Sequence, residues 1–383
     1  MRVTFLTTQL DFSNGGGSNF DRLIKARSLG GSGCRIRFVT TNSRSNRLEG
    51  FSEFPVIQEQ LSPEKFSLVG YQRAITDIMK KFESDTDIYY VDGHVFLLGA
   101  GFYRAAGGKP VIAHFENYGF PTGLLRPPAI KRLKYWFMGL ADRFVFSRWQ
   151  NTVDVFASVS PVTARVYEQR GLNGGRFMIL PNFIDFSIFK EQPRFECPSQ
   201  SRFHVLYNGR LIYERDVATL IRAVALLKDV DIGLDIVGTG PELAKLKTLA
   251  NELGISDRVT WHGRIEHDQL GPVYRHADIV VLTSLWRDAL GMAAIEAMGC
   301  GVPTIVPADT GDAWGVGEAG ITYELGDPKS LAGSIRRLCT DAALRKRLSE
   351  YGLRRAAQEF DYRILTRKLL DRMESLVAAH VST

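Results

Sequence analysis

Two acidic residues, Asp288 and Glu296, lie eight positions apart in the stretch WRDALGMAAIEAMGCGVPT, residues 286–304. Asp288 falls in a polar loop after an apolar run, and Glu296 falls in the opening turn of an expected helix. Backbone N–H groups at a helix start attract anions, phosphates above all. Two carboxylates beside such a helix start would suit the hydroxyl groups of a ligand that also carries phosphate, such as a sugar nucleotide.

Two basic residues, Arg210 and Arg215, follow the strand expected at residues 203–207. Gly209 permits a tight turn directly after that strand, so both guanidinium groups could reach a ligand bound there. Guanidinium groups form charge-assisted, often bidentate hydrogen bonds with phosphate oxygens, and two fixed cations therefore suit a diphosphate. The alternative is that both are ordinary surface arginines.

Other glycine-rich and acidic motifs do not fit the common cofactor or metal sites. The Gly-Thr-Gly-Pro at 238–241 lacks the third glycine of G-x-G-x-x-G, which disfavours NAD binding. The glycines at 15–17 lack the Lys-Ser/Thr pair of a P-loop, although they would let a backbone approach a phosphate closely. The D-x-D at 85–87 precedes its strand and is expected to be a solvated turn. We therefore expect no metal site and no resident cofactor.

The composition is that of an ordinary soluble globular protein. The chain has 383 residues, of which 45% are hydrophobic and 23% charged, and its net charge is +6. The length favours two domains, and the apolar runs are too short for a spanning helix or a signal peptide. The four cysteines are scattered, which argues against a zinc site and for a reduced, cytoplasmic compartment.

The elements that must position the acids and arginines form two similar halves. Apolar strands alternate with helical patterns on both sides of a polar, proline-containing segment, which predicts two Rossmann-like α/β domains. Ligands of such parallel sheets gather beyond the carboxyl ends of the strands, where His94 and His114 also fall. Each histidine taken alone could equally be structural. The expected boundaries are 1–190 for the first domain, 191–202 for the linker, 203–358 for the second domain and 359–383 for a final helix.

A basic and aromatic segment covers residues 126–149. Arginines and lysines beside Trp136, Tyr135 and Phe137 on an expected helix are typical of a surface that lies on an anionic membrane. The alternative is a core helix with a solvated basic face. The sequence leaves both interpretations open.

Taken together, these motifs resemble the retaining glycosyltransferases of family 4, which have the GT-B fold of two Rossmann-like domains facing across a cleft. The resemblance covers nearly the whole chain and is strongest over residues 203–306. The family pattern Glu-x7-Glu, Ala-Met, Gly-x-Pro is similar to Asp288-x7-Glu296, Ala297-Met298 and Gly301-Val302-Pro303. Its Gly-Arg-Leu-x-x-x-Lys-Gly is similar to GRLIYERD at 209–216, and its Val-Gly-x-Gly-Pro is intact at 237–241.

The resemblance implies a role for each matching residue. Arg210 and Arg215 would hold the donor diphosphate, while Glu296 would bind the ribose and Asp288 the transferred sugar. The final helix would cross back to the first domain. The backbone of Leu290, Gly291, Met292 and Ala293 would contact the phosphate and the sugar, and the region of Arg264 and Ile265 would contact the base. Gly16 and Gly17 would contact the diphosphate. His114 would lie by the sugar, near the acceptor.

Three departures from the family pattern affect the expected site. Asp288 stands where the family has glutamate, which retracts the carboxylate by one C–C bond, roughly 1.5 Å. Arg215 replaces a lysine and keeps the charge, whereas Asp216 replaces a glycine and adds a negative charge. None of these changes removes the predicted phosphate-binding arrangement.

The sequence therefore predicts a metal-independent, retaining hexosyltransferase of polysaccharide or glycan biosynthesis. The donor would be a UDP- or GDP-linked sugar, and the acceptor a hydroxyl group of a lipid-linked or other saccharide. The expected location is the cytoplasm or the inner face of the cytoplasmic membrane, without a nucleic-acid partner. The alternatives are a transferase for a small soluble acceptor, a sugar-nucleotide epimerase, and a non-catalytic subunit that binds the nucleotide sugar.

Overall fold

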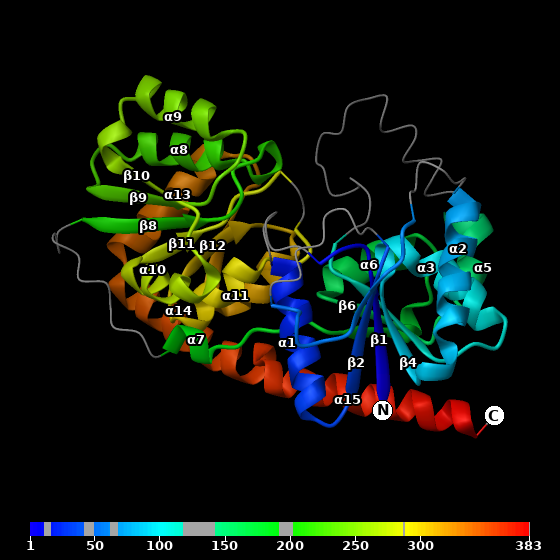
Figure 1. The fold of residues 1–383 in the computed structure, drawn as a ribbon. Coiled ribbons are helices and arrows are strands. Elements are labelled where there is room, and N and C mark those ends of the chain that lie inside the picture. Colours follow the sequence, from blue (N-terminus) through cyan, green and yellow to red (C-terminus); the bar gives the residue numbers. More distant parts are fainter. Residues whose placement is uncertain are drawn as a thin grey trace. The chain divides into compact units, whose positions relative to one another are not determined.

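The computed structural model describes residues 1–10, 17–41, 50–61, 68–117, 142–190, 202–285 and 288–382. Within these ranges the chain forms two compact α/β units (Figure 1). The first unit contains the described residues up to Phe183 together with those from Tyr362 onward. The second contains the described residues from Ile184 to Asp361.

A parallel sheet with the strand order β3-β2-β1-β4-β5-β6-β7 forms the centre of the first unit, as far as it is described. Both faces of this sheet are apolar, as expected for parallel strands that are covered on two sides. Phe5 and Phe38 face one helical layer, whereas Leu6 and Val39 face the other. The strands are β1 Arg2–Thr7, β2 Arg35–Thr40, β3 Val56–Gln58, β4 Ile88–Asp92, β5 Val111–Phe115, β6 Val155–Ser158 and β7 Phe177–Ile179.

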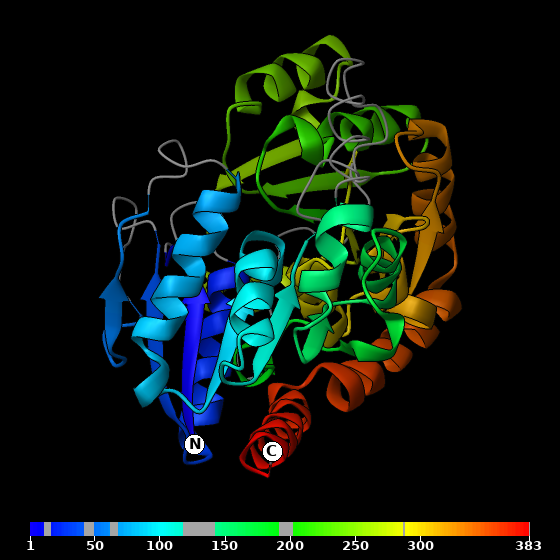
Figure 2. The same ribbon diagram turned by 90° about the vertical axis from the view of Figure 1, so that its right-hand side faces the viewer.

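Helices cover both faces of this sheet. Figure 2 shows α2 and α3 in front of the blue strands, and their apolar side chains share a core with Leu6 and Val39. On the other face, α1 packs beside α15, which buries Leu365 and Leu369. The helices are α1 Gly17–Gly31, α2 Leu68–Lys81, α3 Gly93–Ala105, α5 Ser147–Gln150, α6 Pro161–Gln169 and α15 Tyr362–Val381.

The second unit repeats this plan with the strand order β10-β9-β8-β11-β12-β13, again parallel in the described residues. Val205 and Ile236 belong to its buried core, together with residues of α8 and α13. The strands are β8 Phe203–Asn208, β9 Ile232–Val237, β10 Val259–Gly263, β11 Ile279–Val281, β12 Thr304–Pro307 and β13 Gly320–Tyr323. The helices are α7 Ser187–Lys190, α8 Val217–Leu226, α9 Leu243–Glu252, α10 Leu270–His276, α11 Met292–Gly299, α12 Gly311–Val316, α13 Pro328–Thr340 and α14 Ala342–Arg355.

The first division between the units differs from the predicted boundary at 190. Residues 184–190 belong to the second unit, because their aromatic side chains pack there. The ring of Phe186 fills the space beside Gly299, where a Cβ atom would lie 2.3 Å from it, and Phe189 contacts Tyr274. A parallel bridge also joins Ile184 to Asp361. The predicted linker falls almost wholly outside the described residues.

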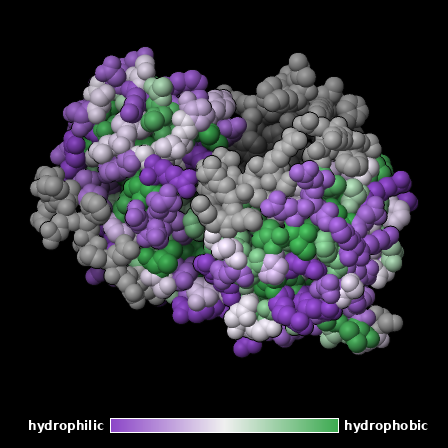
Figure 3. Space-filling model, viewed as in Figure 1, coloured by the Kyte–Doolittle hydropathy of each residue, from purple (hydrophilic) through white to green (hydrophobic). Residues whose placement is uncertain are grey.

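The surface carries both polar and apolar side chains. In the described ranges, no helix combines the length and the hydropathy that crossing a membrane would need. On the face drawn in Figure 3, hydrophilic residues are interspersed with smaller hydrophobic areas. The segment predicted to lie on a membrane is described only from Asp142 onward.

Candidate functional site

The carboxyl ends of β8, β9 and β10 are held together by turns that require glycine. Gly238 has a φ angle of +131°, and a Cβ atom there would lie 1.9 Å from the carbonyl oxygen of Gly209. The N–H of Gly238 donates to the carbonyl of Gly263 at 2.7 Å. These contacts place Arg210, which is exposed, at the carboxyl edge of the sheet.

Arg215 and Asp288 form an ion pair beside this edge. Arg215 ends the short 3-10 turn Tyr213–Arg215, and its Nη1 donates to Oδ2 of Asp288 at 2.6 Å. The hydroxyl of Thr283 donates to the Arg215 carbonyl at 2.7 Å, which ties the turn to the segment after β11. The neighbouring Asp288 carboxylate raises the pKa of the Arg215 guanidinium. Two residues predicted to bind one ligand are thus in direct contact.

Asp216 occupies a backbone position that favours glycine. Its φ angle is +45°, in the left-handed region, where aspartate is better tolerated than most other side chains. It joins the turn at Tyr213–Arg215 to α8. The glycine of the family pattern at this position therefore has a conformational reason, and the added carboxyl group does not prevent the turn.

The loop that carries Asp288 is packed tightly against the segment after β12. The N–H of Gly311 donates to the Asp288 carbonyl at 2.7 Å, and a Cβ atom at Gly311 would lie 1.5 Å from the Ala289 carbonyl oxygen. The N–H of Gly291, just before α11, donates to the carboxyl group of Asp312. We expected this N–H to face a phosphate or sugar, but a side chain of the protein accepts its hydrogen bond in the structure.

Asp312 is a site residue that the sequence analysis missed. It is 1% exposed, and burial together with the nearby Asp288 carboxylate raises its pKa to about 7. The signal that could have found it is its place soon after an apolar strand, the same signal that singled out Asp288. The titratable carboxyl group of Asp312 thus lies beside the loop that carries Asp288.

We expect Asp312→Asn to stabilise the protein at alkaline pH. The folded state holds the Asp312 proton more tightly than the unfolded chain, where the pKa is about 4. The stabilisation that comes from this tighter proton binding is therefore complete below about pH 4, and it is lost as the pH rises through about 7. Thermal unfolding should show the variant about 1–2 kcal/mol more stable than the parent at pH 8, with little difference at pH 4. Lower stability of the variant at pH 8 would contradict the raised pKa.

Glu296 is buried at 2% exposure and lies in the second turn of α11, beyond the opening turn in which we expected it. Its Oε1 lies 2.8 Å from Nε2 of His267, and its Oε2 accepts from the Tyr274 hydroxyl at 2.7 Å. Asn208 donates to the same hydroxyl at 2.8 Å. Burial is the largest single effect and lowers the pKa of His267, but the hydrogen bond to Glu296 and the negative charges of Glu296 and Asp268 together raise that pKa overall. No sequence motif pointed to His267 or Tyr274, which approach Glu296 from α10 and the turn before it.

The other predicted donor contacts line the start of α11 or the end of β10. Leu290 is buried, whereas Met292 and Ala293 are partly exposed at the first turn of α11. After β10, Arg264 is exposed and its Nε donates to Glu266 at 3.1 Å, while Ile265 is half-buried. Their roles toward a nucleotide stay predictions.

His114 lies in a buried, charged cluster of the first unit. Its Nδ1 is 3.4 Å from Oε1 of Glu116, and the other carboxylate oxygen of Glu116 lies 3.4 Å from the guanidinium of Arg22. Arg22 also pairs with Asp92, the last residue of β4, at 3.0 Å. Burial and then Lys25 lower the pKa of His114, so the imidazole is neutral at pH 7. Its Nε2 is buried without a hydrogen-bond partner in the described residues.

The cluster around His114 offers ligand atoms but is a poor metal site. Asp21, His114 and Glu116 lie close enough to surround an ion. Lys25 already pairs with Asp21, however, and Arg22 pairs with Glu116. These cations supply the positive charge that a metal ion would bring. Gly17 begins α1 of the same unit, and Gly16 lies outside the described residues.

The sequence of the second unit matches a known family. Residues 189–355 match the model described as "Glycosyl transferases group 1". The lipopolysaccharide core biosynthesis glycosyltransferase LpsD of Rhizobium meliloti (strain 1021) is 34% identical over 178 residues, which is 46% of this chain and 50% of that protein. A D-inositol 3-phosphate glycosyltransferase of Streptomyces bingchenggensis (strain BCW-1) is 34% identical over 293 residues, which is 72% of this chain and 62% of that protein. The chain thus spans about half to three fifths of the length of these two curated relatives.

Solved structures share the fold over almost the entire chain. Sucrose-phosphate synthase from Thermosynechococcus elongatus superposes on this chain with a TM-score of 0.79 at 19% identity. The superposition covers 99% of this chain and 100% of the synthase chain. Anabaena Alr3699/HepE, in complex with UDP and glucose, has a TM-score of 0.75 at 18% identity. Its superposition covers 98% of this chain and 100% of the Alr3699/HepE chain. These likenesses confirm the predicted α/β architecture of two Rossmann-like units.

Proposed function

Because this chain belongs to the family-4 type of glycosyltransferases and has their GT-B fold, we propose that it transfers a hexose from a nucleotide diphosphate sugar to a hydroxyl group, with retention of the anomeric configuration. The observation that carries the proposal is the contact between Arg215 and Asp288. It brings a cation for the diphosphate and an acid for the sugar to the carboxyl edge of one sheet, where Arg210 also lies.

In the proposed reaction, the acceptor oxygen bonds to the anomeric carbon on the face from which the diphosphate departs. The bond between that carbon and the diphosphate oxygen breaks, and a phosphate oxygen takes the proton of the acceptor hydroxyl. Arg210 and Arg215 stabilise the charge that develops on the diphosphate, so that an essential divalent metal is not needed. Most of the rate would come from this fixed positive charge and from positioning.

The acid groups have separate roles in this proposal. Glu296, oriented by His267 and Tyr274, would accept hydrogen bonds from the ribose through its remaining lone pairs. Asp288, held by Arg215, would contact hydroxyl groups of the transferred sugar. The role that the resemblance implies for His114, beside the sugar near the acceptor, stays a prediction.

A UDP-linked sugar is the first donor to test. The structural relatives support it, because Anabaena Alr3699/HepE has been solved with UDP-glucose at a TM-score of 0.74. We expect one UDP- or GDP-sugar to raise the unfolding temperature of the purified protein, since a ligand bound only by the folded state stabilises it. The same sugar should then be transferred in the presence of a chelator. Binding without transfer would favour the non-catalytic subunit, donor conversion without an acceptor would favour the epimerase, and neither binding nor transfer would overturn the proposal.

We further propose that the acceptor is a lipid-linked saccharide and that the protein reaches it from an anionic membrane surface. Relatives named for lipopolysaccharide core biosynthesis support a saccharide acceptor. At the described end of the basic and aromatic segment, Phe144 is 73% exposed and Val145 56% exposed. Arg143 lies over the ring of Phe144, at 5.5 Å from its centroid, so a cation and an apolar ring are presented together.

We expect Phe144→Glu to weaken binding to anionic liposomes by about tenfold or more. Removing a large apolar side chain from an interface costs roughly 1.5–3 kcal/mol, and the added charge is repelled by the lipid headgroups. Sedimentation with liposomes at low salt measures the effect. Leu226→Glu, which changes an exposed apolar residue of the second unit, is the matched control. Absence of binding by the parent protein would favour a small soluble acceptor.

A further inference from the structure

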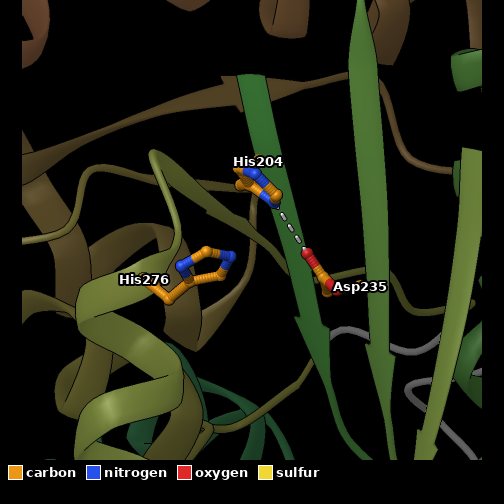
Figure 4. Close-up of side chains that lie close together, drawn as sticks. All are labelled: His204, Asp235 and His276. Atoms are coloured by element: carbon orange, nitrogen blue, oxygen red, sulfur yellow. Dashed lines mark hydrogen bonds and ion pairs between the residues drawn. The ribbon is translucent and has the colours of Figure 1, made fainter. Parts of the chain in front are cut away.

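Three side chains of the second unit converge at a place that the proposed reaction does not use. His204 lies in β8, Asp235 in β9 and His276 at the end of α10 (Figure 4). Their ligand atoms all lie within 4.8 Å of one another. His204 is the second residue of its strand, near the amino end, whereas the candidate donor site follows the carboxyl ends. We propose that His204, Asp235 and His276 form a Zn²⁺ site.

The distances suit a small tetrahedral ion. Nδ1 of His204 is 3.1 Å from Oδ2 of Asp235, and the rings of His204 and His276 have their centroids 4.3 Å apart. Two ligand atoms that are each about 2.1 Å from a tetrahedral Zn²⁺ lie about 3.4 Å from each other. The ligand atoms of all three side chains already lie within 4.8 Å of one another, so closing to this separation would supply three ligand positions, with a fourth for water.

The backbone fixes these groups in place independently of the rings. The N–H of His204 donates to the Asp278 carboxylate at 2.8 Å, and the N–H of Asp278 donates back to the His204 carbonyl at 2.9 Å. This reciprocal pair holds the end of α10 beside β8, and so it brings His276 to His204. The site thus does not depend on chance contacts of long, flexible side chains.

A further residue orients the carboxylate. His262, in β10, has its Nε2 2.7 Å from Oδ1 of Asp235, so that the other oxygen, Oδ2, is turned toward His204. Hydrogen bonds of this kind to a ligating carboxylate are typical of protein metal sites and strengthen them. The side chains of His204 and Asp235 are 16% and 14% exposed, which leaves a path for the ion.

Nitrogen and carboxylate ligands favour Zn²⁺ over Mg²⁺ or Ca²⁺, which prefer oxygen ligands throughout. This cluster is also the better of the two in the described chain. The group around His114 is already neutralised by Lys25 and Arg22, whereas the side chains available to Zn²⁺ here are two imidazoles and one carboxylate. The bound ion would join β8, β9 and α10, and it would act on stability, apart from the transfer reaction.

The test is Zn²⁺ binding by tag-free protein after treatment with a chelator, measured by competition with a chromophoric indicator. We expect one ion per chain and an affinity loss of more than about 100-fold in His276→Gln and in Asp235→Asn. His380→Gln, at the end of α15, should bind as the parent does. Zn²⁺ should also raise the unfolding temperature of the parent and of His380→Gln, but not of the two site variants.

The two site variants separate loss of the ion from loss of the fold. Asp235→Asn keeps the shape of the side chain, and its unfolding without Zn²⁺ should resemble that of the chelated parent. Parent-like affinity in both variants would overturn the proposal, as would fewer than one ion per chain in the parent. Loss of binding in His114→Gln alone would also overturn it, because the ion would then belong to the first unit.

Discussion

Arg210→Ala is expected to lower the rate of transfer from the nucleotide sugar by about 10²–10³-fold. A fixed donor that stabilises charge developing in the transition state contributes about this much, roughly 3–4 kcal/mol. Arg210 is exposed at the carboxyl edge of the second sheet, so the substitution should leave the fold intact. Initial rates at saturating and at low donor concentration measure the loss in kcat and in kcat/KM.

The control for Arg210→Ala is Arg354→Ala, which removes an exposed cation from α14 of the same unit. Its rates and its unfolding temperature should equal those of the parent. If Arg210→Ala were folded and transferred sugar at a near-normal rate, Arg210 would not bind the diphosphate and the assignment of the site would be wrong.

Arg215→Ala is expected to lower transfer by a similar factor and to destabilise the protein as well. The substitution removes a diphosphate contact, and it leaves the Asp288 carboxylate near that of Asp312 without its cation. The Arg215 side chain is 32% exposed, so solvent weakens the ion pair, and we expect a loss of about 1–2 kcal/mol in stability. Transfer rates and thermal unfolding measure the two effects separately.

Arg215→Lys separates charge from shape at this position. The ammonium group keeps the positive charge, and the resemblance implies a lysine here, so transfer should stay within about tenfold of the parent. Adding Asp288→Ala to Arg215→Ala should recover stability but not transfer, because the unpaired carboxylate is then absent. Full activity of Arg215→Ala would show that the pair with Asp288 is only structural.

Much of the fold could be predicted from the pattern of apolar residues. Residues 3–7 and, in the second unit, residues 205–207 are buried on both faces, as expected for a sheet covered by two helical layers. The last helix was also visible as a periodic pattern, and α15 runs from Tyr362 to Val381. The division at Phe183 was not predictable, because it depends on where Phe186 and Phe189 pack, and both lie in a short apolar stretch that either unit could have buried.

The strand-end rule explains why part of the site was found. Arg210, Arg215 and Asp288 each follow an apolar strand, and parallel strands bring their carboxyl ends to one edge of the sheet. The same rule applied to β12 would have found Asp312. It could not have found His267 and Tyr274, which reach Glu296 from a helix and the turn before it.

The sequence by itself indicated the fold class, the resemblance to one family, and the charged groups available at the carboxyl edge of the second sheet, because periodicity and local motifs are short-range properties. Only the tertiary structure decided which of these groups are partners. Arg215 pairs with Asp288 across 73 positions, Asp312 accepts the Gly291 N–H, and His204, Asp235 and His276 meet from two strands and a helix. The physical reason is that the interaction energy of two side chains and the pKa of a titratable group depend on distances in space and on burial. The separation of the residues along the chain determines neither quantity.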